Sequence, residues 1–509
     1  MKKILHVLIV LSLLVILSPV FGASQRTVAF SSSSQGLPLG RVSPLSGGAL
    51  VALDLRSGLL GWPSQSTPES GVAPNLNCKP APCALPNVQA SEGGQPVNED
   101  PIAVDSNNTK HLLTGGNDYN CRASLQGFYT SGDGGKKWSH TCMSTISGCS
   151  GAGDPGVGYN LTGAAYITGI DICSNGWHII FEKSTNNGLT WSSPAIAVNP
   201  IFSGGLTDKD WLQIDDSPTS PFANSLYISV TQFDSSSNSE ISVTYSHNNG
   251  ATWTTVGVDT KQIYPNVDQF SDLAVAKDGT VYVSWMRCTA NGPAGDCGGT
   301  TASLMVSKST DGGKTWSSPV TIAKVNLAPD ACSCAFYGSL PNTSERVSEI
   351  PAIDVDRSSG TFAGNVYVVM YNWTGSFMQV EVSTSTDGGN TWSIPVHVAP
   401  KSDNHDQFFP WLTVSPTGIV GVTWLDRRND PSNINYEAFA TVSKNGGAGF
   451  KADVQIASTA SDPFHDGFNG GFMGDYTGNY WATGKVLMAS WMDTRNNVNC
   501  QDEVGGYKV

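Results

Sequence analysis

Positive charge is scarce in this chain of 509 residues. Lys and Arg together number 28 against 42 Asp and Glu, so the formal net charge is −14, and only 14% of the residues are charged. Proteins that hold nucleic acid or anionic membranes need clusters of Lys and Arg. The composition therefore argues against nucleic acid and against anionic membranes as partners.

A second long apolar run is also missing from the sequence. The first such run, 4–17, follows two Lys residues and ends shortly before a Val20-Phe21-Gly22 cleavage sequence. This pattern predicts a secretory signal at 1–22, and no later stretch has the length that spans a bilayer. Without the two Lys of the signal the charge falls to 26 − 42 = −16. We expect a secreted, extracellular protein without a membrane span.

Long helical periodicity is absent as well, and short β-branched runs broken by Gly, Asn and Pro take its place. Six copies of one turn motif run through these segments. The motif has the pattern S-x-D-x-G-x-T-W and is the Asp box. Three copies carry Asn at the Asp position, and the last of these is degenerate and ends in Phe450. The copies occupy 131–138, 184–191, 246–253, 309–316, 385–392 and 443–450.

The Asp box is expected to lock a hairpin. The Asp or Asn side chain accepts N–H groups of its own turn, and the Gly takes a positive φ without a steric cost. The Trp closes the hairpin and fills space between neighbouring sheets. Because a motif repeated along the fold serves the fold, we assign the boxes no catalytic or calcium-binding role.

The spacing of the boxes predicts the architecture. Successive boxes begin 53, 62, 63, 76 and 58 residues apart, and periods of this size indicate a propeller. The unit 409–457 contains four strands, with its box between the third and the fourth. We predict an all-β fold, a single β-propeller of four-stranded blades with the boxes in the turns between third and fourth strands. Seven inner strands begin near Pro101, Asp154, Asp210, Ser271, Ile350, Phe409 and Gly474.

The last unit reaches Val509 with room for three strands and without a box. Its missing strand is expected from the segment 86–91, whose pairing with blade 7 would close the ring and remove a sheet edge. Six blades remain the alternative count. We therefore divide the chain into a signal at 1–22, a Ser-, Gly- and Pro-rich leader at 23–85, expected to be mobile or loosely packed, and the propeller at 86–509.

Eleven Cys follow the predicted signal, which suits an oxidising compartment. Cys288 and Cys297 are expected to bridge one loop, and Cys78 and Cys83 could pair locally. Because the number is odd, one thiol is free or pairs between chains. A metal site built on these Cys is the weaker interpretation, since no His lies at ligand spacing from them in the sequence. The sequence indicates no cofactor and leaves calcium binding open.

Function is expected on one face of the ring. In a four-stranded blade, the loops between blades and the loops between second and third strands share a face, which we call the loop face. The boxes and the turns between first and second strands lie on the opposite face, which we call the box face. The loop-face segments are rich in polar and aromatic residues. We single out Glu99, Tyr476, Asp426, Asp493, Arg287, Arg428, Arg495, His405 and Trp373.

The Arg residues on this rim support two hypotheses. Trp424-Leu-Asp426-Arg-Arg428 and Trp491-Met-Asp493-Thr-Arg495 repeat W-x-D-x-R, and Arg287 lies in the corresponding segment of blade 4. Convergent Arg would bind a carboxylate or sulfate bidentately, and paired acids would serve glycoside hydrolysis. In the second hypothesis each Asp–Arg pair is a salt bridge that orders its own loop. His405, which precedes an Asp, orients a substrate or cation or caps a turn.

The boxes and blades resemble the sialidase superfamily of Asp-box propellers over about 95–509. The resemblance implies an Arg triad for the substrate carboxylate, an Asp acid/base and a Tyr nucleophile paired with a Glu. Arg287, Arg428 and Arg495 match the triad, and Tyr476 matches the nucleophile. The sequence departs from the family at Glu349-Ile350-Pro351, where the nearest match to the family's Arg-Ile-Pro carries Glu, and in having seven blades where sialidases have six.

Two function classes follow. The first is a secreted sialidase-like enzyme that hydrolyses glycans, including acidic sugars, with Asp426, Asp493, Tyr476 and Glu99 as catalytic residues. Its substrate-binding residues are Arg287, Arg428, Arg495, His405 and Trp373. The second is a non-catalytic extracellular propeller that binds a glycan or glycoprotein or assembles on the cell surface. A carboxylate pair with Arg around a deep central pocket would favour the enzyme, and Arg residues locked to neighbouring Asp would favour the binder.

Overall fold

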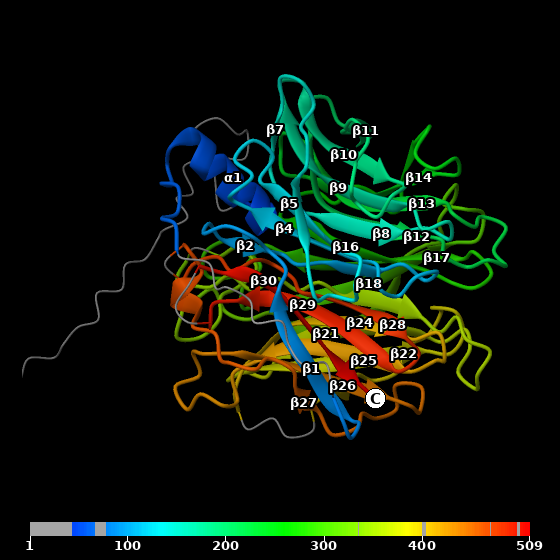
Figure 1. Cartoon of the computed structure of the whole chain (residues 1–509). Helices are drawn as coiled ribbons and strands as arrows, with labels where there is room; N and C mark the ends of the chain where they lie inside the picture. The colour runs from blue at the N-terminus through cyan, green and yellow to red at the C-terminus, as the bar shows by residue number, and fades with distance from the viewer. Residues whose placement is uncertain (1–42, 67–77, 334, 400–403, 469, 496–498) are drawn as a thin grey trace, which may run out of the picture.

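The computed structural model describes residues 43–66, 78–333, 335–399, 404–468, 470–495 and 499–509. The predicted signal at 1–22 lies outside these residues. The strands form seven antiparallel sheets of four or five strands each (Figure 1). The chain thus has the propeller fold that its boxes predict, and the count of seven blades is confirmed.

The first and second strands of each blade lie nearest the axis of the ring. Blades 1 and 2 divide their innermost strand into two short pieces, so these sheets have five strands. The innermost strands are β2 (Val97–Asn98), β3 (Ile102–Val104), β7 (Ser150–Gly151), β8 (Gly156–Tyr159), β12 (Leu206–Ile214), β16 (Asn266–Val275), β20 (Ala352–Val355), β24 (Gln407–Val414) and β28 (Gly478–Thr483). The second strands are β4 (Leu112–Asp118), β9 (Ala165–Cys173), β13 (Leu226–Phe233), β17 (Val281–Thr289), β21 (Val366–Trp373), β25 (Val420–Asp426) and β29 (Val486–Asp493).

The outer half of each blade faces the solvent, and its last strand is short and partly exposed. The third strands are β5 (Gln126–Ser131), β10 (Gly176–Ser184), β14 (Ser239–Ser246), β18 (Thr301–Ser309), β22 (Met378–Ser385), β26 (Glu437–Ser443) and β30 (Gln501–Lys508). The fourth strands are β6 (Ser139–Cys142), β11 (Ala195–Val198), β15 (Thr254–Gly257), β19 (Val320–Asn326), β23 (Val396–His397), β27 (Val454–Gln455) and, in blade 7, β1 (Cys83–Gln89).

Strand β1 closes the ring, as predicted. It pairs antiparallel with β30, from Cys83 opposite Lys508 to Gln89 opposite Glu503, and Figure 1 shows blue β1 beside the red C-terminal strands. The strand begins three residues before the predicted segment 86–91 and ends at Gln89. Because blade 7 takes its outer strand from the N-terminal side, β30 is paired on both sides, with β29 and with β1.

Each box follows the last residue of a third strand, and that residue is the Ser of the motif. In the fourth copy, Ser309 Oγ donates to Asp311 Oδ1 at 2.8 Å and accepts the Gly313 N–H at 2.9 Å. Asp311 Oδ1 in turn accepts the Thr315 N–H at 2.9 Å, and Gly313 has φ of +89°. The same Ser-to-Asp/Asn and Gly-to-Ser bonds recur in all six copies. The buried Ser is therefore the centre of the lock.

Second strands carry the largest buried side chains. Trp285, Trp424 and Trp491 occupy related positions in blades 4, 6 and 7 and are at most 2% exposed. They belong to clusters of Val, Ile, Leu and aromatic side chains that fill the space between neighbouring blades. Flat aromatic rings suit this wedge-shaped space because they bury a large area between two sheets.

The leader contains the helix α1 (Gly47–Ser57), which the sequence analysis missed. Its residues Leu45, Ala49, Val51 and Ala52 are fully buried, so the expectation of a mobile or loosely packed leader is wrong for this segment. The buried residues Gly48, Val51, Ala52 and Leu55 lie three or four positions apart, so one face of α1 is covered. No helix within the described residues is long and apolar enough to cross a membrane.

Four disulfides are resolved in the described residues. The expected bridges Cys78–Cys83 and Cys288–Cys297 are present. The sequence left the pairing of the other Cys near blades 1 and 2 open, and the structure joins Cys121 to Cys142 and Cys149 to Cys173. Cys500 is a buried free thiol, in agreement with the odd number.

We predict that Ser309→Ala lowers the free energy of unfolding by about 1–3 kcal/mol, because the buried Gly313 N–H loses its acceptor. Asp311→Ala should cost less than Ser309→Ala, because the Asp311 side chain is largely exposed to water, which replaces the lost hydrogen bonds. Urea unfolding followed by tryptophan fluorescence measures both. A larger loss for Asp311→Ala than for Ser309→Ala would contradict the central role of the Ser.

Candidate functional site

At the loop-face end of the inner strands, one residue in each of five blades has an unusual backbone conformation. Glu99, Asp154, Lys209, Phe270 and Phe409 all have φ between +45° and +65°. In three blades the pairing of the inner strand is interrupted at this point, as between Asp208 and Trp211. Such bulges re-aim side chains beside sites, and positive φ in residues other than Gly is maintained only by strong local constraints. The result is a ring of polar and aromatic side chains at the loop-face end of the axis.

Carboxylates dominate this end of the axis, and we call Glu99, Asp154, Asp208, Asp210 and Asp475 the axial acids. All five are at most 1% exposed. Burial together with the neighbouring Asp154 and Asp475 raises the pKa of Glu99 well above its usual range. Burial also raises the pKa of Asp210 to about 8. Asp210 therefore holds its proton for most of the time at neutral pH.

Two cations lie among the axial acids. Arg346 Nε lies 2.8 Å from Asp475 Oδ1 and its side chain is 5% exposed. Lys209 is fully buried, and its ammonium lies 3.9 Å from the centre of the Tyr476 ring. The charges of the acids are thus balanced by protons, one Arg and one Lys, which is how buried carboxylates are tolerated.

The N-terminus of α1 occupies this acidic mouth. Ser46 donates its N–H and its hydroxyl to Asp208, at 2.8 and 2.9 Å, and Gly47 donates its N–H to Asp475 at 2.7 Å. A helix N-terminus carries free N–H groups and partial positive charge, so carboxylates are its natural partners. A Cβ atom on Gly48 would lie 2.8 Å from Asp154 Oδ1, so Gly permits this close approach.

An aromatic layer lies directly below the axial acids. Trp211 and Trp411 come from opposite sides of the ring and lie 4.4 Å apart between ring centres, and Tyr476 packs edge-on against Trp211 at 5.6 Å. The Tyr476 hydroxyl donates to the Pro155 carbonyl at 3.2 Å. Together α1, the acids and these rings fill the axis from the loop face.

The rim residues Arg428 and Arg495 are paired within their own blades. Arg428 lies 2.5 Å from Asp426 and also contacts Asp453. Arg495 lies 2.6 Å from Asp493 and 3.3 Å from Glu503. In each motif the indole N–H of the preceding Trp donates to the same Asp, at 2.8 Å from Trp424 and 3.1 Å from Trp491. The W-x-D-x-R motif therefore forms a brace between the second strand and its loop.

Arg287 has the same arrangement in blade 4. Its guanidinium donates to Asp268 at 2.6 and 2.7 Å and to Asp259 at 2.5 Å. The three Arg that resemble a sialidase triad thus each contact acids of their own part of the ring. The structure does not gather them around Tyr476, whose ring packs against Trp211, Trp411 and Lys209.

The remaining sequence candidates divide between the axis and the periphery. Glu99 and Tyr476 lie together on the axis, since Glu99 Oε1 accepts the N–H of Asp475, the residue before Tyr476, at 3.2 Å. Trp373 ends β21 and is partly buried on the periphery, where its carbonyl accepts the Asn326 side chain at 3.4 Å. His405 is half-buried just before β24.

A second mouth opens on the box face. The inner strands of all seven blades surround a narrow cavity of about 60 Å³ below the aromatic layer. It continues into a wider cavity of about 300 Å³, which we call the box-face pocket. This pocket is lined by the turns between first and second strands of several blades, and it includes Asp216, Thr219, Arg357, Tyr480 and Trp481.

Arg357 organises the box-face pocket. Its guanidinium forms an ion pair with Asp216 and lies 3.8 Å from Asp354. The Tyr480 hydroxyl donates to the other Asp216 oxygen at 3.2 Å. Arg357 and Asp216 are each about one-fifth exposed, so this network forms part of the pocket wall while remaining mostly dry.

The sequence predicted a functional site on the loop face, so Arg357, Asp216 and Tyr480 were not among the predicted site residues. A signal was present: inner strands in blades 1, 3 and 5 end in Asp105, Asp215 and Asp356, which accept backbone N–H groups of the following turn. Arg357 and Asp216 directly follow two of these Asp. A recurrent Asp after the inner strand thus marks three of the turns that build the box-face pocket.

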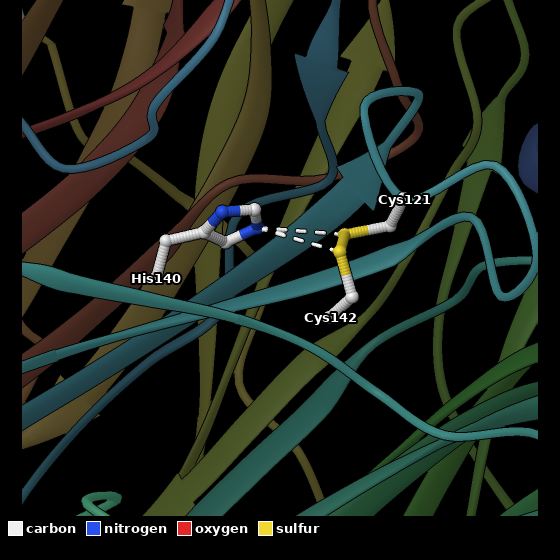
Figure 2. Close-up of side chains that lie close together, drawn as sticks. All are labelled: Cys121, His140 and Cys142. Carbon is white, nitrogen blue, oxygen red and sulfur yellow. Dashed lines mark hydrogen bonds between the residues drawn. A yellow bond between two sulfur atoms is a disulfide. The ribbon is translucent and has the colours of Figure 1, made fainter.

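One side-chain cluster has metal-ligand character. Cys121, His140 and Cys142 point toward one another in blade 1, as Figure 2 shows. The two sulfurs are joined in a disulfide, and oxidised sulfur is not a thiolate ligand. His140 lies beside the bridge because β5 pairs with β6. The spacing of residues in the sequence did not reveal this contact.

No protein-family model and no curated protein matches the chain. Solved structures do. A protein of unknown function from Dyadobacter fermentans is 12% identical, with 72% of this chain and 97% of that chain covered and a TM-score of 0.43. The intramolecular trans-sialidase from Ruminococcus gnavus is 12% identical, with 70% and 94% covered and a TM-score of 0.44. The α-L-arabinanase of Penicillium chrysogenum is 12% identical, with 69% and 92% covered and a TM-score of 0.43.

We predict that Arg428→Ala lowers the free energy of unfolding by about 2–3 kcal/mol, because mostly buried Asp426 loses a charge-assisted partner. A double-mutant cycle with Asp426→Asn, measured by urea unfolding, isolates the pair. The double variant should lose clearly less than the sum of the two single variants. Additive losses would show that the pair does not brace the loop.

The axial acids predict a pH dependence of stability. The folded pKa of Asp210, about 8, lies above the value of about 3.9 for an exposed Asp. Its contribution to stability is therefore complete below about pH 4 and disappears as the pH rises through about 8. Between pH 5 and 8, the free energy of unfolding should fall less steeply with pH in Asp210→Asn than in the wild type. The two slopes should differ by at most about 1.4 kcal/mol per pH unit. Unchanged slopes in urea titrations at several pH values would contradict this.

Proposed function

We propose that this protein is an extracellular, non-catalytic propeller that binds a neutral glycan in its box-face pocket. The observation that carries the proposal is the pocket itself: a cavity of about 300 Å³ at the open end of the axis, with a fixed polar network on its wall. Ligand sites are concave, largely pre-formed and fitted with a few placed polar groups among apolar ones.

The pocket wall suits a polyhydroxylated ligand. Tyr480 and Trp481 provide aromatic surface, and Ser and Thr hydroxyls from several turns surround them. Sugars present apolar ring faces and hydroxyl edges, so aromatic rings beside hydroxyl, carboxylate and guanidinium groups match both features. A cavity of this size is at the small end of ligand sites and fits a terminal sugar unit.

The charges around the pocket favour a neutral sugar over an acidic one. Asp216 and Asp354 carry two negative charges, which Arg357 and the exposed Lys277 balance. Because the Arg357 guanidinium already pairs with a carboxylate, a second carboxylate from sialic acid would have to compete with Asp216. This is the opposite of a sialidase pocket, where Arg residues await the substrate carboxylate.

Hydrolysis is disfavoured at the loop face for two reasons. The rim carboxylates Asp426 and Asp493, which would serve as acid and base, are each held by the Arg and the Trp of their own motif. The N-terminus of α1 also uses Asp208 and Asp475 as hydrogen-bond partners, so the axial mouth is filled. The axial acids therefore act as the receptor for α1.

An extracellular setting is consistent with the chemistry of the chain. The signal pattern at 1–22 directs export, and four disulfides in the described residues suit an oxidising compartment. Free glycans and glycoproteins are abundant there, so a polar pocket on a stable ring has available ligands.

We predict that Thr219→Trp weakens binding of a neutral oligosaccharide at least tenfold. Thr219 is exposed at the mouth, so the larger ring obstructs the pocket without breaking the Arg357 network. Binding is measured by calorimetry after a glycan-array screen of the secreted protein has identified a ligand. Wild type should prefer neutral glycans to sialylated ones.

Arg428→Ala provides the matched control, because it removes a loop-face Arg and leaves the box-face pocket unchanged. It should bind the neutral glycan as the wild type does. If Arg428→Ala abolishes binding while Thr219→Trp retains it, the site is on the loop face and the proposal fails. Release of sugar from chromogenic glycosides by wild type, lost in Tyr476→Phe, would restore the enzymatic alternative.

A further inference from the structure

The box of blade 1 packs against its neighbour less closely than the other boxes do. In blades 3, 4 and 5 the second strand carries a Tyr beneath the box of the next blade. A Cβ atom added to the Gly of that box would lie 3.2–3.4 Å from the ring: Gly313 over Tyr227, Gly389 over Tyr282 and Gly447 over Tyr367. These contacts close the seams between blades on the box face, because a large aromatic ring fills the space.

Blade 7 has a smaller side chain at the corresponding position. Met488 lies three residues before Trp491, as Tyr282 lies three residues before Trp285, so the two positions are related. A Cβ atom on Gly135, the Gly of the blade 1 box, would lie 3.8 Å from the end of the Met488 side chain. The seam between blades 7 and 1 is therefore packed less tightly than the seams that a Tyr closes.

The third strand of blade 7 contributes no side chain at this point. Gly506 is paired with Met488, whereas in blade 3 Tyr245 is paired with Tyr227. A groove of about 290 Å³ results, which we call the seam groove. Its apolar lining comes from four strands: Leu85 and Val88 of β1, Leu112 of β4, Val486 and Met488 of β29, and Val504 of β30.

The seam groove continues into the box-face pocket. Thr109 and Ala482 line both cavities. Trp481 lines the pocket and Thr483 lines the groove, so a short step along the end of β28 leads from one cavity to the other. A ligand with a sugar unit in the pocket therefore has a path past Ala482 into an apolar space.

We propose that the seam groove holds an apolar aglycone attached to the neutral sugar in the box-face pocket, so that the ligand is an alkyl or aryl glycoside. The inference rests on the proposed function, because the pocket has to hold the sugar. A glycoside joins a hydroxyl-rich ring to an apolar group through one oxygen, and the two cavities offer surfaces in the same order. Polar groups of the pocket bind the ring, and the lining of the groove removes the aglycone from water.

Other occupants fit the seam groove less well. A protein partner needs about 800 Å² on each side, whereas the groove has the volume of a small-molecule site. A membrane surface is bound by apolar side chains that protrude from the protein. The large apolar side chains that are exposed in the described residues do not line the groove: Leu59, Leu189, Ile201, Ile263, Ile394 and Phe464. A recess of this kind suits a single apolar group that enters it.

Methyl and n-octyl glycosides of glucose, galactose and mannose test the inference on the whole secreted protein. Calorimetry measures each pair below the concentration at which the octyl compounds form micelles. For at least one of the three sugars, the octyl glycoside should bind at least 30-fold more tightly than the methyl glycoside. A fully buried CH₂ group raises affinity about fourfold, so burial of three of the seven additional groups is sufficient.

Met488→Tyr closes the groove, since it supplies the ring that blade 3 has at Tyr227. It should leave the affinity for the methyl glycoside unchanged and reduce the advantage of the octyl chain to less than threefold. Val88→Asp changes a half-buried side chain of the groove and places a charge there, so it should have the same effect if Met488→Tyr fails to fold. Thr219→Trp, which obstructs the pocket, should weaken both glycosides at least tenfold.

The outcomes separate this inference from the proposal on which it rests. Equal affinity of the wild type for methyl and octyl glycosides overturns the groove and leaves the sugar site standing. An octyl advantage that persists in the groove variants also overturns it, because the chain then binds elsewhere. If none of the six glycosides binds, the inference fails, and the glycan-array screen decides separately on the proposed function. Wild-type affinity of Thr219→Trp for the octyl glycosides contradicts both.

Discussion

The pairing of β1 with β30 is the constraint on which the rest of the molecule depends. It joins the start of the propeller to its last blade, from Cys83 opposite Lys508 to Gln89 opposite Glu503. A closed ring has an axis with two defined mouths, whereas an open array of sheets has neither. The hydrogen bonds of this one pair of strands therefore create the setting for both the axial acids and the box-face pocket.

The axis changes character from one mouth to the other. At the loop face, the N-terminus of α1 meets buried carboxylates, and the Trp211–Trp411 pair lies below them. At the box face, Arg357 and Asp216 remain partly exposed around an open cavity. Buried carboxylates favour the partial positive charge of a helix end, so the leader is held where a substrate would be expected. The accessible chemistry consequently lies at the other end.

Prediction from the sequence succeeded where local patterns decide structure. Box turns recur because Ser, Asp or Asn and Gly at fixed offsets close a hairpin with their own hydrogen bonds, as Ser309 does with Gly313. The prediction of a loosely packed leader failed for Ser43–Ser57. The partners of this segment, such as Asp208 and Asp475, lie far along the chain, so the composition of the segment itself does not indicate them.

The sequence by itself determined the blade, the number of blades and the strand that closes the ring, because strand alternation and turn chemistry are local and repeated. Only the tertiary structure decided the use of charged residues. Arg428 is a brace because Asp426 and Asp453 lie within reach. Arg357 shapes a pocket because the turns of several blades converge on the axis around it. The sequence shows Arg at both positions. The role of each Arg depends on which side chains lie within its reach once the ring is closed.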